Sequence, residues 1–129
     1  MTDLLTLPEV LSIHADQIAR YGGRPGMRGP GHLEAALYRA KTGRYLDVIE
    51  EAAALWESLA QYRPFVSANE RTAFAATYTL LAVNGVELSA NAADTYAFIA
   101  DLYPTNGFSF EILVPWLRAH IGAAQAQGS

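Results

Sequence analysis

The chain has no cysteine among its 129 residues. This excludes disulfides, thiolate zinc sites and cysteine nucleophiles. No apolar run approaches the roughly 18 residues of a membrane span, and the start of the chain lacks the basic flank and apolar stretch of a secretory signal. No Walker loop, Rossmann fingerprint or His-Glu-x-x-His cluster occurs. We therefore expect a cytoplasmic protein with no membrane segment and no metal site built from protein ligands.

The size and charge of the chain limit the number of domains and the kinds of ligand to be expected. Hydrophobic residues make up 51% of the chain, so we expect a single packed domain over residues 1–129, with a frayed tail after Ile121. The net charge of −4 argues against a nucleic-acid ligand. The segment from Arg20 to Arg44 has six cations and one acid, Glu34, so it is +5 and the rest of the chain is −9. It is either a solvated basic face or a lip that attracts an anion or an acidic peptide.

Apolar residues recur every three or four positions along most of the chain, which indicates amphipathic helices. Thr6 and Glu9 have the spacing of a capping box before the first helix, which Gly22 and Gly23 should end. A Gly/Pro-rich loop over residues 22–31 and a short helix follow. Four more helices are predicted from about Tyr45 to Tyr62, from the 63–73 segment to Asn84, from Asn91 to before Pro104, and after Ser109. The predicted fold class is all-α, with about six helices around the fourth and the aromatic residues in the core.

The segment from Arg63 to Ala73 reads Arg-Pro-Phe-Val-Ser-Ala-Asn-Glu-Arg-Thr-Ala and leads into the fourth predicted helix. Free N–H groups and the helix dipole make such a helix start a natural cradle for phosphate. Arg71, in the first turn, could donate two hydrogen bonds to phosphate oxygens. Asn69 is expected either to bind a phosphate or to fix the loop backbone. Phe65 is expected to anchor the loop in the core.

Residues 63–73 resemble the signature loop of the Fic/Doc family, whose pattern is His-x-Phe-x-Asp/Glu-x-Asn-Lys/Gly-Arg. The scaffold positions are retained as Pro64, Phe65, Asn69, Arg71, Thr72 and Ala73. The resemblance extends in matching order over residues 10–90, including Ile13–Met27, Leu33–Leu37 and Val83–Val86. It favours the death-on-curing (Doc) branch and implies a Fic/Doc-like (Fido) domain.

The resemblance also implies a function. Members of this family transfer part of a nucleoside triphosphate to a hydroxyl group of a target protein. The Doc branch transfers a terminal phosphate, and its target is elongation factor Tu. The cofactors implied are ATP and Mg²⁺. The partners implied are a translation factor and a small antitoxin of the prevents-host-death type, whose C-terminal segment covers the site in a toxin–antitoxin module.

Three positions of the signature are changed, and each is a candidate site residue. Arg63 replaces the histidine, and because guanidinium stays protonated it cannot accept the proton of a target hydroxyl. Ser67 replaces the acidic residue and brings no charge to hold magnesium. Glu70 replaces Lys or Gly and puts negative charge where a phosphate would enter. A base would have to come from elsewhere, and His14 lies on an apolar stripe that predicts a core position.

Ser67 and Glu70 also have the spacing of a capping box, in which each side chain accepts from the other's backbone N–H. This pair would occupy the donors that a phosphate needs. Alternatively, Asn69 is the cap and Glu70 is free in solvent.

Three functions remain open. The first is a Doc-like protein that is impaired in transfer and acts as a binding module, and the three replacements favour it. The second is an active phosphotransferase or nucleotidyltransferase with altered chemistry. The third is a relic domain without a partner.

Overall fold

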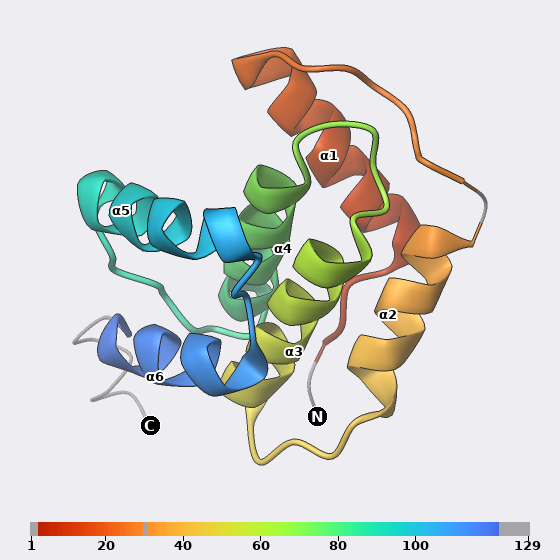
Figure 1. Cartoon of the computed structure of the whole chain (residues 1–129). Coiled ribbons are helices and arrows are strands. Elements are labelled where there is room, and N and C mark those ends of the chain that lie inside the picture. The colour runs from red at the N-terminus through yellow and green to blue at the C-terminus, as the bar shows by residue number, and fades with distance from the viewer. Residues whose placement is uncertain (1–2, 30, 122–129) are drawn as a thin grey trace.

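The computed structural model describes residues 3–29 and 31–121, and this part of the chain is almost entirely helical (Figure 1). The helices are α1 (Leu7–Tyr21), α2 (His32–Thr42), α3 (Val48–Tyr62), α4 (Asn69–Val83), α5 (Ala92–Leu102) and α6 (Phe110–Ala119), with a 3₁₀ turn η1 (Tyr103–Thr105) after α5. Within the described residues, extended structure is limited to two isolated bridges. The prediction of an all-α fold with about six helices is confirmed. The predicted frayed tail after Ile121 lies outside the described residues.

The helix ends follow local chemistry. At the start of α1 the Glu9 N–H donates to the Thr6 hydroxyl and the Thr6 N–H donates to the Glu9 carboxylate, which is the predicted capping box. α1 ends at Gly22, whose φ of 84° a glycine adopts without strain. α3 begins later than predicted, because the Asp47 carboxylate accepts from the Glu50 N–H at 3.0 Å and fixes the cap there.

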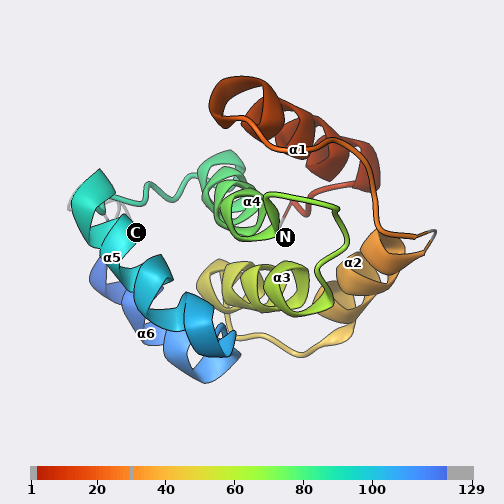
Figure 2. The same ribbon diagram turned by 45° about the horizontal axis from the view of Figure 1, so that its top comes forward.

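α3 occupies the centre of the bundle. It packs against α2, α4 and α6, and nine of its 15 residues are buried (Figure 2). Its run Ala52–Ala54 is short-chained, which lets neighbouring helices approach closely. α4 packs mainly against α1 and α3 and leaves Tyr78 and Val83 exposed. The expectation that the fourth helix would be central is therefore wrong.

The aromatic residues divide between the core and the surface. Trp56 is fully buried, and its ring makes edge contacts with Phe74, Phe98 and Trp116 at centroid distances of 5.3, 6.0 and 5.8 Å. Tyr96, on α5, is 76% exposed, and α5 has no fully buried residue. The prediction that the aromatic residues lie in the core holds for the Trp56 cluster and is wrong for several tyrosines.

No helix of the described residues is both long and apolar enough to cross a bilayer.

Candidate functional site at the start of α4

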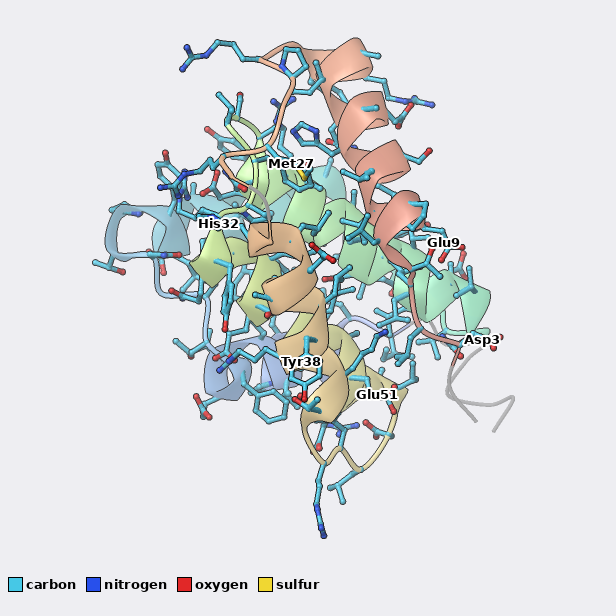
Figure 3. The ribbon with its side chains drawn as sticks, turned by 90° about the vertical axis from the view of Figure 1, so that its right-hand side faces the viewer. Asp3, Glu9, Met27, His32, Tyr38 and Glu51 are labelled. Carbon is cyan, nitrogen blue, oxygen red and sulfur yellow. The ribbon has the colours of Figure 1, made fainter. Side chains whose placement is uncertain are left out.

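Two loops lie together at the N-terminal end of α4. The loop between α1 and α2 carries Met27, which Figure 3 shows above the start of α2, and Met27 forms an antiparallel bridge with Phe65 of the signature loop. The Val66 N–H donates to the Gly26 carbonyl at 3.0 Å, and the Arg28 N–H donates to the Pro64 carbonyl at 2.8 Å. The signature loop is therefore held by backbone pairing to a segment about 40 residues earlier in the sequence.

Asn69 fixes the backbone of the signature loop. The Phe65 N–H donates to Asn69 Oδ1 at 3.0 Å, and Asn69 Nδ2 donates to the Phe65 carbonyl at 2.9 Å. Both residues are buried, so these bonds are shielded from water. Both polar atoms of the Asn69 carboxamide bond the loop backbone, which confirms the expectation that Asn69 fixes the loop. A further role in phosphate binding stays a prediction.

His14 contacts the signature loop from α1. Its ring stacks on Phe65 with centroids 3.8 Å apart and planes 5° apart. Its Nε2 lies 3.0 Å from the Ser67 carbonyl, and since a carbonyl only accepts, Nε2 carries the proton in this contact. His14 is buried as its place on the apolar stripe predicts, but nothing in the sequence indicates that it supports the loop.

The start of α4 differs from both predicted capping arrangements. Ala68 is the N-cap, with a φ of 65°, and no side chain of residues 3–29 or 31–121 caps the helix. Asn69 is the first helical residue, so it is not the cap, and Ser67 does not pair with the Glu70 backbone. The left-handed Ala68 turns Ser67 towards the other loop, where a Cβ built on Gly23 would lie only 2.7 Å from the Ser67 hydroxyl.

The consequence is an open helix terminus. In the described part of the chain, the backbone N–H groups of Asn69, Glu70 and Arg71 have no acceptor, and the first helical bond is made by the Thr72 N–H to the Ala68 carbonyl. The predicted self-satisfied helix start is therefore wrong. The donors that could cradle an anion are still available.

Arg63 and Glu70, two of the three replaced positions, contact one another. Arg63 ends α3 in the left-handed region, with a φ of 47°, and its backbone N–H donates to the Leu59 carbonyl. Its guanidinium forms an ion pair with the Glu70 carboxylate through Nη1 and Oε2. The two side chains are 38% and 16% exposed, so Glu70 is not free in solvent as the alternative arrangement had it.

Arg71 is directed to the end of α1. Its Nη2 donates to the Gly22 carbonyl at 2.8 Å and its Nη1 donates to the Gln17 carbonyl at 3.4 Å. The guanidinium also lies 5.9 Å from the centre of the Tyr21 ring. Arg71 thus caps the C-terminus of α1 and ties it to α4. Its predicted role as a phosphate ligand is not tested by these contacts.

An open groove of about 620 Å³ lies between α1, α4 and α5, and Arg71 contributes to its wall. We call it the tyrosine groove, because Tyr21, Tyr78 and Tyr96 line it and are 66%, 45% and 76% exposed. Among the described residues that line it, Arg71 is the only charged one. The sequence missed this groove because these tyrosines have the same spacing as core residues.

The side chains that could hold a metal ion are few at the start of α4. Among the described residues, no group of three or more histidine, aspartate or glutamate side chains is placed to hold a metal ion. Ser67 is uncharged, and the Glu70 carboxylate is engaged by Arg63. Magnesium would therefore depend on nucleotide phosphates and water for its ligands.

In the helix–loop–helix of α3 and α4, the buried pair of Phe65 and Asn69 fixes the loop, and within the described residues no side chain caps the start of α4. The model of the Fic/DOC family matches residues 4–81. The protein called Toxin Doc, from Mycolicibacterium smegmatis, is 40% identical over 96 residues, which are 70% of this chain and 72% of the relative. Protein kinase doc from Escherichia phage P1 is 34% identical over 84 residues, 62% of this chain and 67% of the relative. The chain belongs to the Fic/DOC family, in its Doc branch.

Proposed function

We propose that this protein is the toxin-type member of a toxin–antitoxin module, impaired in transfer, and that it acts as a binding module. The names of two of its relatives, Toxin Doc and Protein kinase doc, support the toxin class. The observation that carries the proposed impairment is the ion pair between Arg63 and Glu70.

The ion pair bears on proton transfer. A target hydroxyl needs a base, and loss of a general base costs about 10²–10⁴-fold in rate. The histidine position is filled by the guanidinium of Arg63, which is already protonated and therefore cannot accept a proton, and which is bound by a carboxylate. His14 does not take over this role, since it is buried and its Nε2 proton is directed to the Ser67 carbonyl.

The tyrosine groove is the proposed partner site. An antitoxin segment of the prevents-host-death type, folded as an amphipathic helix, would cover Tyr21, Tyr78 and Tyr96 with its apolar face. An acidic residue in that segment would face Arg71. Of the cations between Arg20 and Arg44, Arg20 and Arg39 are already paired with acids, so they add little attraction for an acidic partner.

A second candidate is an active transferase, and the open N-terminus of α4 favours it. The N–H groups of Asn69, Glu70 and Arg71 would bind the phosphates of ATP, with magnesium supplied alongside. The target would be a hydroxyl of a translation factor such as elongation factor Tu.

Labelled ATP separates the two candidates. The native protein is incubated with elongation factor Tu and with cell extract, using alpha- and gamma-labelled ATP side by side. We expect no transfer by the native chain. The triple variant Arg63→His, Ser67→Asp, Glu70→Lys is expected to gain transfer, because the scaffold around it is intact. Label moved by the native chain, and lost with Arg63→Ala, would overturn the proposed impairment.

Partner binding has its own test. A fluorescent peptide from the C-terminal segment of a prevents-host-death antitoxin is titrated with native protein and with Tyr96→Asp, which puts a charge into the groove. We expect affinity to fall at least about tenfold, as for loss of an interface aromatic. Tyr38→Asp is the matched control, since Tyr38 is 71% exposed on α2 and outside the groove. Equal binding by both variants would reject the groove as the partner site.

A further inference from the structure

α5 and α2 have the same length but differ in burial. Each has 11 residues, and eight of those in α5 are of hydrophobic types, against six in α2. α2 nevertheless buries Leu33, Ala36 and Leu37, whereas α5, which is described in full, has no buried residue. Much of the apolar surface of α5 therefore stays in contact with solvent, which is unfavourable for a helix of this composition.

The segments on either side of α5 are fixed by hydrogen bonds. Before the helix, the Ser89 N–H donates to the His120 carbonyl at 2.7 Å. After the helix, Gln61 Nε2 donates to the Asn106 and Phe108 carbonyls at 2.9 and 3.0 Å. Between these two anchors α5 lies at the edge of the bundle, on the side away from α2 (Figures 1 and 2).

The aromatic ring of Phe98 is the main contact of α5 with the core. It stacks on Trp116 with centroids 4.5 Å apart and planes 10° apart, and it meets Trp56 edge-on at 6.0 Å. Ile99 and Leu102 also pack against the core, and both are only half-buried. The position of α5 thus depends on a small number of side-chain contacts.

We propose that α5 is a strap, tied at both ends, that opens and closes the tyrosine groove while the other helices stay packed. The flanking segments are the hinges, since they keep their hydrogen bonds to α3 and to the end of α6. Closing moves Phe98 off Trp116 and brings Tyr96 towards Tyr78 on α4, which buries apolar surface that α5 now exposes. The motion needs no occupant in the groove, so it goes beyond the proposed function.

Native-state hydrogen exchange of the full chain tests whether α5 opens by itself. It is measured at rising urea concentrations below the unfolding transition, and α2 is the matched helix. We expect the α5 amides to exchange at least about tenfold faster than those of α2, with a weaker dependence on urea because opening α5 exposes little surface. Equal rates and equal urea dependence in the two helices would reject the strap, since α5 would then open only with the whole chain.

Phe98→Ala removes the main contact of the strap. We expect the α5 amides to lose most of their protection in this variant, while α2 and α3 stay protected. Tyr96→Ala is the matched control on the same helix, since Tyr96 is 76% exposed, and it should exchange like the native chain. The strap is wrong if Phe98→Ala unfolds all the helices together, or if both variants release α5 equally.

Closing is tested with introduced cysteines, because the chain has none of its own. The pair Tyr78→Cys and Tyr96→Cys lies across the groove and forms a disulfide only when the two Cα atoms come within roughly 7 Å. Tyr38→Cys with Tyr96→Cys is the control pair, since Tyr38 is on α2 and outside the groove.

We expect oxidised glutathione to produce the intramolecular disulfide in the groove pair and not in the control pair. Adding Phe98→Ala should accelerate it at least about tenfold, because the ring no longer has to leave Trp116. No disulfide in the groove pair, or the same rate with and without Phe98→Ala, would reject the closing motion. Neither measurement uses a partner peptide, so a failure of the proposed partner site leaves both readouts intact.

Discussion

Most of the retained positions of the signature loop are buried, and the replaced positions are not. Phe65, Asn69, Thr72 and Ala73 are each no more than 2% exposed and Pro64 is buried, whereas the retained Arg71 is partly exposed. Among the replaced positions, the side chains of Arg63 and Glu70 are 38% and 16% exposed, and Ser67 is partly exposed. The first group packs or bonds inside the protein, whereas the second faces the site. A change in the second group alters chemistry at little cost to the fold.

Phe65→Ala should give the largest effect on stability. The ring is fully buried and stacks on His14, so its loss leaves a cavity, and we expect unfolding free energy to fall by about 3–5 kcal/mol. Urea unfolding measures this. Val66→Ala, at the next position, is the control. The Val66 side chain is 41% exposed, so its truncation should lower the unfolding free energy by less than about 1 kcal/mol. A similar loss for both variants would show that burial does not separate the two groups.

Asn69→Ala should give the second largest loss of stability. It leaves the Phe65 N–H and carbonyl without their buried partners, and we expect a loss of about 2–3 kcal/mol in unfolding free energy. Asn69→Asp, which keeps the acceptor and loses the donor, should be intermediate. Hydrogen exchange at the Phe65 amide should accelerate in Asn69→Ala and much less in Asn69→Asp. Unchanged exchange in both would mean that another group holds the loop.

Gly23→Ala tests the contact between the two loops. A Cβ there would lie 2.7 Å from the Ser67 hydroxyl and 3.2 Å from Arg71 Nη2, and the φ of 117° is strained for alanine. Gly22→Ala is a matched control, because its φ of 84° is also positive but its Cβ would meet no atom within 4 Å. In thermal unfolding, Gly23→Ala should be less stable than Gly22→Ala by about 1 kcal/mol. Equal stabilities would indicate that Ser67 and Arg71 move aside freely.

Glu70→Gln should have the smallest effect on stability. It removes a partly exposed ion pair, and we expect a change below about 1 kcal/mol in unfolding free energy. The change should shrink further at high salt. A loss as large as that of Asn69→Ala would place Glu70 among the residues that hold the loop, and the contrast between the two groups would fail.

The helical part of the fold could be predicted because its signals are local. The capping box at Thr6 and Glu9 and the stop at Gly22 involve residues within one turn of each other. The central place of α3 could not be predicted in this way. Its alanine-rich surface and that of α4 look alike in sequence, and which helix is surrounded depends on how all of them pack.

The sequence identified which residues make up the site but not how they are arranged. Residues 63–73 identified the loop, its helix start and the three changed positions. The capping arrangement was wrong because Ala68 takes up a left-handed conformation, which no alanine favours by itself. That one backbone angle turns Ser67 away and leaves the first-turn donors of α4 without a cap.

The sequence alone determined the helices, the capping box of α1, the family resemblance and the absence of an imidazole at position 63, because each depends on residue identity and short-range spacing. The tertiary structure alone decided that Arg63 meets Glu70, that His14 supports a loop 53 residues away, and that three tyrosines border a groove. These depend on how distant segments pack and on backbone angles imposed by that packing, which local patterns do not encode.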